Sequence, residues 1–484
     1  METPRESKLT RRDFLAGLGA SAAGLALARH AFAEKLEASR LNVLYITADD
    51  LGADSVGVFG CKIPGISPNL DALAAEGMRF ERAHVTVAVC QPCRSVWMTG
   101  RYPHRNGAVG FQPINRDVPT LSETLSKSDY FNGIMAKVGH LAPREKFAWD
   151  VVVEADDLNQ GRDPALWYTH VKDFLKEARA SGKPFFLMAN SQDPHRPWPG
   201  SEAETQTRKN KNFPTASRHY KPEEIEVPGF LPDVPEVRTE LAQYYSAVHR
   251  CDESVGQVLR ALKEEGLEDN TIVFFQSDNG ASFPTAKSCV YNHSTRTPLI
   301  VRWPGKVKAG SVNREDFVSG IDMMPTILDA AGVPQVDGVD GRSFLPLLRS
   351  EKQSGRERVI TVYHETSANN EYPMRCVRNG RFAYIFNDWA DGRTVYRAEP
   401  LGGISFKGMQ SAAEKDPKLA ERVKFIQYRA SEEFYDMEAD PNELGNLIAD
   451  PTHKATIEKM RAELLEWMVA VKDPLLDAFK KQIG

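Results

Sequence analysis

Short apolar runs alternate along the chain with longer segments whose apolar positions recur at helical spacing. The runs have the length and apolar continuity of strands buried on both faces of a sheet. They cover residues 41–47, 131–138, 184–189, 271–275 and 299–302. The helical segments lie at residues 67–80, with Ser67 as the expected N-cap, and at residues 165–180, 236–266 and 321–331. This alternation predicts a doubly wound α/β fold with a mostly parallel central sheet flanked by helices.

The pattern changes near residue 355. Strand-like segments follow one another closely at residues 359–363, 374–378 and 382–386. Asn379-Gly380, between the last two, is a strong hairpin signal. An amphipathic segment at residues 453–471 predicts a closing helix. These features predict a smaller α+β unit that carries an antiparallel sheet.

The length of 484 residues suits one large domain with a smaller one beside it. We divide the chain into a leader at residues 1–33, a large domain at residues 34–355 and a C-terminal subdomain at residues 356–484. Residues 196–235 are rich in proline and polar residues and have no periodicity. They predict a long surface loop over a functional region.

The formal net charge is −5, which gives no bulk attraction to nucleic acid or to an anionic membrane. We therefore expect no nucleic-acid partner. A polyanionic substrate would have to be bound by a local cationic pocket.

The first 33 residues have the features of an export signal. Residues 10–15 (TRRDFL) have the twin-arginine form, residues 17–28 are weakly apolar, and Ala31-Phe32-Ala33 offers a small-x-small cleavage site. A membrane anchor is the alternative, but the apolar run is short for a bilayer and is interrupted by Arg29 and His30. The leader predicts a periplasmic or secreted protein that is exported by the twin-arginine translocase.

Polar and charged side chains follow four of the predicted strands. The carboxyl ends of parallel strands form one edge of a sheet, and ligands bind there in open α/β folds. Each group alone is explained by a turn or a helix cap, but together they favour a site. They are Asp49 and Asp50 after the first strand, Lys137 and His140 after the second, Asp193 and His195 after the third, and Asp278, Asn279 and Lys287 after the fourth.

The acids and the amide in this set predict a hard cation. Three carboxylates at one point would repel one another strongly without positive charge between them. Oxygen ligands suit Ca²⁺ or Mg²⁺, whereas Zn²⁺ would favour histidine or cysteine. The lysines and histidines beside them suit an anion bound to the metal. The set therefore predicts chemistry on a small oxyanion ester such as a sulfate or a phosphate.

The segment from Cys90 to Arg101 (CQPCRSVWMTGR) supplies a nucleophile. Pro92 fits the first turn of a helix, and a helix N-terminus at Cys90 would stabilise a developing negative charge. Arg94 follows one turn later on the same face. The alternative for Cys90 and Cys93 is a disulfide or a redox motif, which would not need converging carboxylates.

With this segment the chain resembles the formylglycine-dependent sulfatase family, from about Leu41 to Pro474. The resemblance rests on C-x-P-x-R followed by T-G-R from Cys90, and on ADDLG at residues 48–52, Lys137 with His140, DPHRP at residues 193–197 and SDNG at residues 277–280. It implies an alkaline-phosphatase-like fold. It also implies that Cys90 is oxidised to formylglycine by a formylglycine-generating or sulfatase-maturating enzyme.

The resemblance implies a role for each residue of the set. Calcium would be held by the modified Cys90 together with Asp49, Asp50, Asp278 and Asn279. Arg94 and Lys137 would hold the sulfate and the hydrated aldehyde, a gem-diol that attacks sulfur. His140 would act on its hydroxyls, and His195 and Lys287 would face the sulfate and the leaving group.

The sequence departs from the family pattern at two places. Two residues separate Lys137 from His140, whereas many sulfatases have one between the corresponding lysine and histidine. Cys93 occupies a position that is more often serine or alanine.

Further motifs resemble the branch of the family that hydrolyses the N-sulfate of glucosamine in heparan. They include Phe283-Pro284, His364-Glu365, Tyr372-Pro373-Met374-Arg375, Asp440-Pro441-Asn442-Glu443 and Asp473-Pro474. The branch implies that the second domain helps to hold the sugar, with Asp193, His364 and Glu365 as substrate-binding residues.

Three alternatives remain open at this point. They are an O-sulfatase acting on another sulfated carbohydrate, a phosphate or phosphonate ester hydrolase of the same superfold, and a sulfated-glycan binding protein that is never matured. The sequence does not fix the oligomeric state, and a dimer is one option.

Overall fold

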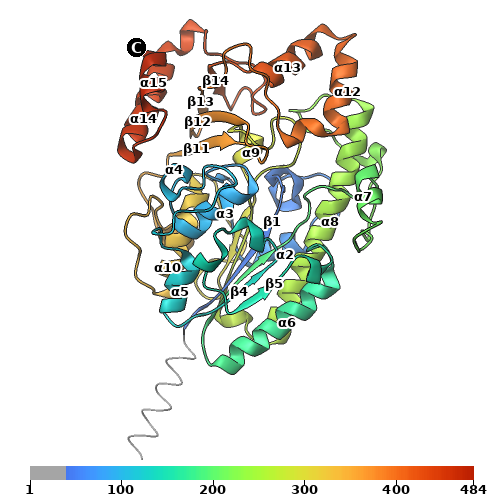
Figure 1. Ribbon diagram of the computed structural model, residues 1–484, viewed down its shortest axis with the longest axis vertical. Coiled ribbons are helices and arrows are strands. Elements are labelled where there is room, and N and C mark those ends of the chain that lie inside the picture. Colours follow the sequence, from blue (N-terminus) through green and yellow to red (C-terminus); the bar gives the residue numbers. More distant parts are fainter. Residues whose placement is uncertain (1–39) are drawn as a thin grey trace, which may run out of the picture.

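The computed structural model describes residues 40–484, so the predicted leader at residues 1–33 lies outside the described residues. The largest element is an eight-stranded sheet, of which β1, β4 and β5 are labelled in Figure 1. Its strand order is β5-β4-β6-β1-β7-β8-β2-β9. Strand β8 runs antiparallel to β7 and β2, and the other neighbours are parallel, which confirms the predicted mostly parallel sheet. The strands are β1 (Asn42–Ala48), β2 (Met78–Phe80), β4 (Phe131–Met135), β5 (Val151–Val153), β6 (Phe185–Asn190), β7 (Thr271–Ser277), β8 (Leu299–Arg302) and β9 (Ser311–Asn313).

Strand β1 separates two hydrophobic cores, one on each face of the sheet. Val43 and Tyr45 belong to one core, and Leu44 and Ile46 belong to the other, as the two-residue repeat of a strand requires. Burial on both faces explains the uninterrupted apolar sequence of this strand. The first core lies under α3 (Cys90–Thr99), α5 (Leu121–Lys127) and α10 (Met323–Ala331). The second lies under α2 (Pro68–Glu76), α6 (Pro164–Ser181) and α8 (Pro235–Glu264).

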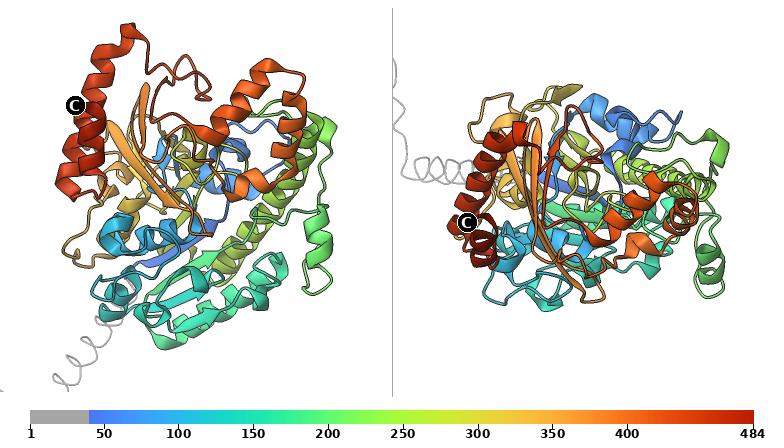
Figure 2. Two further views of the ribbon diagram at one scale, coloured as in Figure 1. Left: turned by 45° about the horizontal axis from the view of Figure 1, so that its top comes forward. Right: turned by 90° about the horizontal axis from the view of Figure 1, so that it is seen from above.

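The C-terminal residues form the predicted antiparallel sheet, in the order β11-β12-β13-β14. Its edge strand is bonded to the segment that leads into α3, because the Val362 amide donates to the Thr86 carbonyl at 2.8 Å. The sheet and the helices that accompany it pack against the larger unit (Figure 2). The elements are β11 (Arg358–Glu365), β12 (Glu371–Asn379), β13 (Phe382–Asn387), β14 (Glu432–Asp436), α12 (Ile404–Ala413), α13 (Pro417–Tyr428), α14 (Lys454–Val471) and α15 (Leu476–Ile483).

The sequence did not predict strand β14, because EEFYD lacks the alternation of apolar and polar residues that is typical of a half-buried strand. Both glutamates are buried, and their carboxylates are satisfied by hydrogen bonds. Glu432 accepts from the Tyr384 hydroxyl at 2.5 Å, and Glu433 accepts from the hydroxyls of Tyr291 and Tyr435 at 2.6 and 2.7 Å. Buried carboxylates need such partners, and three different parts of the chain supply them.

The remaining helices and strands are short. One of them, α7, lies in the segment at residues 196–235 that was predicted to be a long loop. These elements are β3 (Ala83–His84), β10 (Val318–Ser319), α4 (Pro103–Asn106), α7 (Glu202–Thr207), α9 (Asn292–Thr295) and α11 (Leu345–Leu348).

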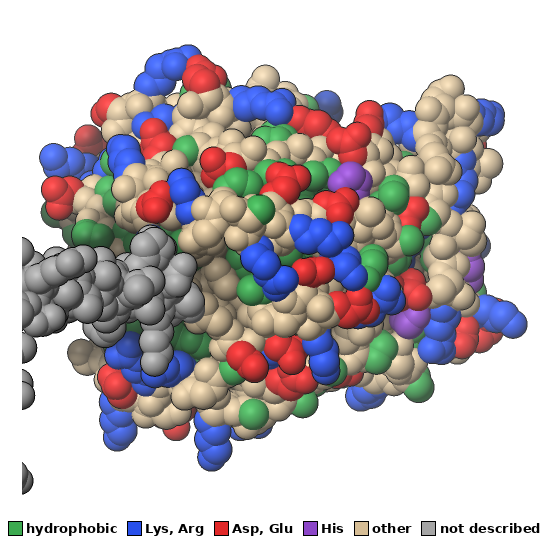
Figure 3. Space-filling model, turned by 90° about the horizontal axis from the view of Figure 1, so that it is seen from below, with side chains coloured by type: hydrophobic (Ala, Val, Ile, Leu, Met, Phe, Trp, Pro, Cys, Tyr) green, Lys and Arg blue, Asp and Glu red, His purple; other side chains and the backbone are tan. Residues whose placement is uncertain are grey.

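On the face shown in Figure 3, basic and acidic side chains are interspersed and neither sign gathers into a large patch. This distribution agrees with the small net charge of −5. None of the helices in residues 40–484 has both the length and the apolar character needed to cross a bilayer.

The N-terminus of α2 is capped by a residue that sequence reasoning did not find. Ser67 makes no side-chain capping bond and instead accepts a hydrogen bond from the Gly57 amide at 2.8 Å. The carboxylate of Asp252, on α8, accepts from the amides of Asn69 and Leu70 at 3.1 and 2.8 Å. An acidic group at a helix N-terminus also interacts favourably with the helix dipole. Asp252 therefore joins α2 to α8.

We predict that Asp252→Ala lowers the free energy of unfolding by roughly 1–3 kcal/mol, because two amides of the first turn of α2, one of them buried, lose their acceptor. Chemical denaturation would measure the change. Glu253→Ala is the matched control, since Glu253 is the next residue of α8 and makes no side-chain hydrogen bond or ion pair within residues 40–484. Equal stability of the two variants would contradict this capping role.

Candidate active site

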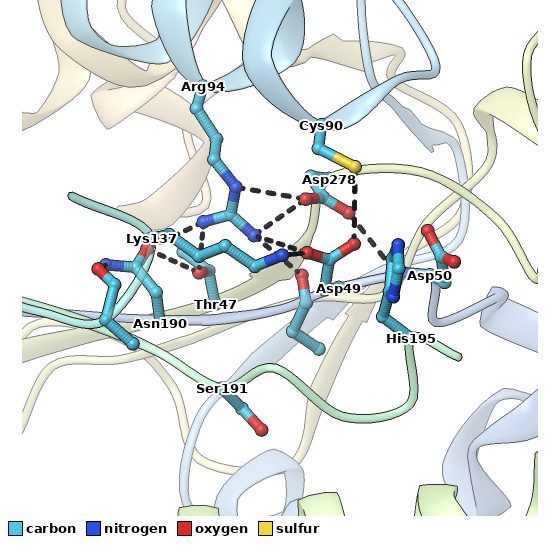
Figure 4. A network of polar contacts seen from close by, with 12 residues as sticks. Thr47, Asp49, Asp50, Cys90, Arg94, Lys137, Asn190, Ser191, His195 and Asp278 are labelled. Atoms are coloured by element: carbon cyan, nitrogen blue, oxygen red, sulfur yellow. Dashed lines mark hydrogen bonds and ion pairs between the residues drawn. The ribbon is translucent and has the colours of Figure 1, made fainter. Parts of the chain in front are cut away.

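The four strand ends that carry the predicted residues are neighbours in the sheet, in the order β4-β6-β1-β7. Their side chains meet at one edge, opposite the N-terminus of α3 (Figure 4). Single ligand atoms of Asp49, Asp50, Cys90 and His195 all lie within 4.8 Å of one another. The structure therefore brings residues from β1, β6 and α3 to a common point.

Three carboxylates lie at the centre of this cluster. Asp49, Asp50 and Asp278 are each 0% exposed. The Asp50 amide donates to Asp278 Oδ1 at 3.2 Å, and Asn279 Nδ2 donates to Asp50 Oδ1 at 2.7 Å. Buried carboxylates at this spacing need compensating positive charge.

Arg94 is the cation that joins the cluster to the sheet. Its guanidinium donates to Asp278 Oδ2 at 3.0 and 2.6 Å and to Thr47 and Asn190 at 3.0 and 2.7 Å. Sequence reasoning missed Thr47 and Asn190. The available signal was a polar side chain at the last position of each buried run. These bonds fix the orientation of α3 against β1 and β6.

Two lysines supply further positive charge to the buried carboxylates. Lys137 forms an ion pair with Asp49, and Lys287 Nζ lies 2.8 Å from Asp50. Burial lowers the pKa of Lys137 to about 7. For Lys287, burial alone would lower the pKa, but the carboxylates of Asp50 and Glu399 raise it well above its usual range. Lys287 is therefore charged at neutral pH.

The residues fit a bound Ca²⁺ or Mg²⁺. Asn279 Oδ1 is buried without a hydrogen-bond donor among residues 40–484, whereas the buried Asp49 Oδ2 is paired with Lys137. A buried oxygen without a partner is costly, and a bound cation would satisfy it. Carboxylate and amide oxygens are the ligands that these two ions prefer. Asp49, Asp50, Asp278 and Asn279 are thus a chemically suitable ligand set.

Cys90 is the first residue of α3, where the sequence predicted a helix N-terminus. Its Sγ lies 3.4 Å from Asp49 Oδ1. Burial raises the pKa of this thiol far above its ordinary value, so the thiol stays protonated at neutral pH. Cys93 instead belongs to the hydrophobic core. Both cysteines are free thiols in the structure, which argues against the disulfide alternative.

The two predicted histidines lie beside the lysines. His195 Nδ1 donates to the Arg196 carbonyl at 2.6 Å, so its Nε2 is left for the cluster. Burial and the ammonium groups of Lys287 and Lys137 hold the pKa of His195 well below its usual value. Burial, followed by Lys137, does the same for His140. Both rings are neutral at pH 7.

Backbone conformations that non-glycine residues rarely adopt recur around the site. Positive φ angles are found at Asp50 (67°) and Lys137 (54°), and also at Thr285 (67°) and Ser288 (61°) on either side of Lys287. Such conformations cost roughly 1–3 kcal/mol each and persist where the surrounding structure enforces them. Their position suggests that they aim the carboxylate and ammonium groups.

Asp193, which the sequence assigned to substrate binding, is enclosed by arginines in the structure, and its contact with substrate stays a prediction. It is 0% exposed, and its carboxylate is held by Arg162 and by Arg250, whose Nε lies 2.6 Å from Oδ2. Arg162 also donates to the backbone carbonyls of His195 and Arg196 at 2.9 and 3.2 Å. Asp193 therefore positions the His195 segment through Arg162.

His364 and Glu365 lie at the end of β11, and Glu365 is linked to the N-terminus of α3. Glu365 accepts a hydrogen bond from Gln112, and the Gln112 carbonyl accepts one from Gln91 at 3.1 Å. Gln91 directly follows Cys90. His364 Nε2 is buried without a hydrogen-bond partner in the described chain. The structure thus connects Glu365 to the residue that follows the nucleophile, whereas His364 lies among Arg375 and His104. The contact of either residue with a sugar stays a prediction.

Several of the branch motifs hold the C-terminal sheet in place. Arg375, from Tyr-Pro-Met-Arg, is paired with Asp473 at 2.7 Å, and both side chains are 0% exposed. Glu443 accepts from Arg378 and from the Asn292 amide, each at 2.6 Å. These motif residues are structural, because they bond to one another and to the larger unit.

The site contains one acid that sequence reasoning missed. Glu399 belongs to a 3₁₀ turn at Glu399–Gly402, in the C-terminal part of the chain, and lies 3.0 Å from Lys287 Nζ. It follows no strand and belongs to no motif, so the sequence offered no signal for it.

Comparison with known proteins agrees with this geometry. A model of the sulfatase family matches residues 41–333. A second model, described as N-sulphoglucosamine sulphohydrolase, C-terminal, matches residues 285–395. The two matches together span both sheets of the structure except its last strand.

Individual relatives match over most of the chain. Human N-sulphoglucosamine sulphohydrolase is 30% identical over 468 residues, which cover 90% of this chain and 91% of the human protein. An ulvan-active sulfatase of Formosa agariphila is 27% identical, with coverages of 90% and 76%. A solved structure in complex with its substrate D-glucosamine-2-N,6-O-disulfate has a TM-score of 0.67 at 20% identity, covering 90% of this chain and 99% of that one. This likeness confirms the expected alkaline-phosphatase-like sulfatase fold.

We predict that Asp193→Ala lowers the free energy of unfolding by roughly 3–5 kcal/mol, because it leaves two buried guanidinium groups without their carboxylate. Thermal and chemical denaturation would measure this loss. Asp156→Ala is the control, since its ion pair with Lys211 is exposed to solvent and should contribute little to stability. A fully stable Asp193→Ala protein with weakened substrate binding would instead support the substrate role.

Proposed function

The chain belongs to the sulfatase family, and from that premise we propose that it is a calcium-dependent enzyme that removes sulfate from a sulfated sugar, preferentially the N-sulfate of glucosamine. The observation that carries this proposal is the position of Cys90. Its side chain emerges from a helix N-terminus and faces three buried carboxylates and the cations that surround them. A single anionic group bound there would meet a nucleophile, a metal site and several donors at once.

We propose that Cys90 is oxidised to formylglycine by a maturation enzyme. Hydrated formylglycine supplies a hydroxyl nucleophile for sulfur and a route for releasing sulfate afterwards. The position of residue 90 supports this assignment, since the helix N-terminus favours negative charge at that point. Arg94, one turn later, holds the nearby Asp278 in place.

Ca²⁺ would be held by Asp49, Asp50, Asp278 and Asn279, and would supply positive charge to the sulfate oxygens. The buried Asn279 Oδ1, which no donor within residues 40–484 contacts, supports this assignment. Mg²⁺ suits the same donors, although it requires a more regular octahedral shell.

The remaining groups suit the two proton transfers of the reaction. His195 presents Nε2 to the leaving group because its Nδ1–H donates to a carbonyl, and it would protonate the leaving group after Nε2 has taken up a proton from solvent. His140 would take a proton from the side chain at residue 90. Lys137 and Lys287 would stabilise the negative charge of the sulfate in the transition state.

For an N-sulfated sugar, the S–N bond breaks and a new S–O bond forms. Water supplies the oxygen to sulfate and both of its protons to the nitrogen, which leaves as an ammonium group. The net products are one sulfate dianion and one glucosamine cation.

The match of the C-terminal region to the N-sulphoglucosamine sulphohydrolase model supports the N-sulfate as substrate. The similarity to an ulvan-active sulfatase favours a second candidate, an O-sulfatase acting on another sulfated carbohydrate. The twin-arginine pattern at residues 10–15 supports a periplasmic or secreted site for either reaction.

We predict that calcium-loaded protein, co-expressed with a formylglycine-generating enzyme, releases sulfate from glucosamine N-sulfate faster than from N-acetylglucosamine 6-sulfate. Ion chromatography of sulfate would measure both rates. Cys90→Ala should abolish release because the nucleophile is lost, whereas Cys93→Ala, which removes a thiol from the core, should retain it.

Preference for the 6-sulfate would favour the O-sulfatase candidate. Faster hydrolysis of matched phosphate or phosphonate esters would favour the alternative hydrolase of the same superfold. Inactivity of protein that carries unmodified cysteine at residue 90 would favour a binding protein.

We also predict that Ca²⁺ raises the melting temperature of the protein, because a ligand that binds the folded state stabilises it by mass action. A calcium titration after chelator treatment would measure the shift. Asn279→Ala should reduce the shift strongly, whereas Asn212→Ala, at an exposed amide, should not. Equal shifts in both variants would contradict the proposed ligand set.

A further inference from the structure

Glu399 enters the active site from the C-terminal part of the chain. Its Oε2 accepts from the Ser282 hydroxyl at 2.6 Å and lies 3.0 Å from Lys287 Nζ. Its Oε1 lies 3.3 Å from Arg196 Nε. Ser282 and Lys287 follow β7, and Arg196 follows β6, so three partners from the catalytic edge of the sheet fix this carboxylate. Three partners from two different segments would not be expected around a carboxylate that made only a chance surface contact.

Lys287 joins Glu399 to the proposed metal-binding carboxylates. Its Nζ lies 2.8 Å from Asp50 and 3.0 Å from Glu399. The Glu399 side chain is 37% exposed, whereas Asp50 is 0% exposed. Glu399 therefore lies on the open side of the cluster.

The leaving group of the reaction must lie on that side. The nucleophile at residue 90 attacks sulfur from the closed side of the cluster, and in-line displacement places the bond that breaks opposite it. The sugar atom bonded to sulfur thus points toward the region of His195 and Glu399. The two residues are joined through Arg196, because its carbonyl accepts from His195 Nδ1 at 2.6 Å and its Nε lies 3.3 Å from Glu399 Oε1.

A carboxylate at this position can distinguish substrates only through a contact with the leaving group. Its repulsion of the anionic sulfate, and its partial cancellation of the Lys287 charge, act on O-sulfates and N-sulfates alike. The ester oxygen of an O-sulfate has lone pairs and no proton, so it cannot bond to a carboxylate. The nitrogen of an N-sulfate carries a hydrogen that can be donated, and the product amine carries a positive charge. An acceptor that penalises one substrate and stabilises the other gives specificity.

We propose that Glu399 is a specificity-determining residue that accepts a hydrogen bond from the nitrogen of an N-sulfated amino sugar and pairs with the ammonium group of the product. This inference rests on the proposed function and names the group that distinguishes N-sulfate from O-sulfate. Glu399 also borders a hollow of about 610 Å³, whose other walls include Thr366, Ser367, Arg397 and Lys407. The hollow gives the sugar room beside the carboxylate, next to the segment that follows His364-Glu365.

The test compares the binding of D-glucosamine and N-acetyl-D-glucosamine to the matured, calcium-loaded protein by titration calorimetry. The pH should be about 6, where a sugar amine is protonated. We expect the wild type to bind glucosamine roughly tenfold or more tightly, the usual size of a charged hydrogen bond. Glu399→Gln, which keeps the shape of the side chain, should remove this preference. Glu202→Gln, at an exposed carboxylate in a neighbouring hollow, should keep it.

Sulfate release from glucosamine N-sulfate and N-acetylglucosamine 6-sulfate gives an independent readout. Glu399→Gln should reduce kcat/KM for the N-sulfate about tenfold and leave the 6-sulfate within about twofold. An equal loss for both substrates would show that Glu399 only positions Lys287 and would overturn the proposal. An unchanged glucosamine preference in the variant, or no preference in the wild type, would also overturn it.

Failure of the proposed function would look different. Wild-type protein that releases sulfate from neither sugar, or that prefers the 6-sulfate, would count against the substrate assignment. The binding comparison does not need turnover, so it would still decide whether Glu399 recognises an amine.

Discussion

Three buried carboxylates at one edge of the sheet are the constraint on which the rest of this structure depends. Asp49, Asp50 and Asp278 are excluded from water at the ends of two adjacent strands. Their mutual repulsion requires cations from other elements. Arg94 of α3 meets this need through Asp278, and in doing so it places Cys90 beside Asp49. The contacts of Arg94 therefore both balance the negative charge and place the nucleophile.

A second set of buried ion pairs holds the outer parts of the site. Asp193 and its two arginines fix the segment that carries His195. Arg375 with Asp473 fixes the C-terminal sheet, whose strand β11 bonds to the segment before α3. The C-terminal part of the chain thus does more than cover the catalytic edge. It places Glu365 near the N-terminus of α3 and brings Glu399 into contact with Lys287.

The inner part of the site could be predicted from the sequence because it depends on local features. Apolar runs revealed β1, β4, β6 and β7, and parallel strands must deliver their terminal side chains to one edge. The outer part depends on contacts between distant segments. The motif at residues 193–197 gave no sign that Asp193 is enclosed by Arg162 and Arg250, nor did Ser67 reveal that Asp252 caps α2. Glu399 lies in a turn without periodicity or motif, so only the folded chain shows its place.

The central claim is that residue 90 is placed to become formylglycine and to attack sulfate. Mass analysis of the tryptic peptide Ala83–Arg94, from protein co-expressed with a formylglycine-generating enzyme, tests it most directly. We predict that Cys90 in this peptide loses its sulfur and two hydrogens and gains one oxygen, that Cys93 keeps its thiol, and that the modified fraction scales with sulfate release. A peptide with both thiols intact from protein that nevertheless releases sulfate would contradict it.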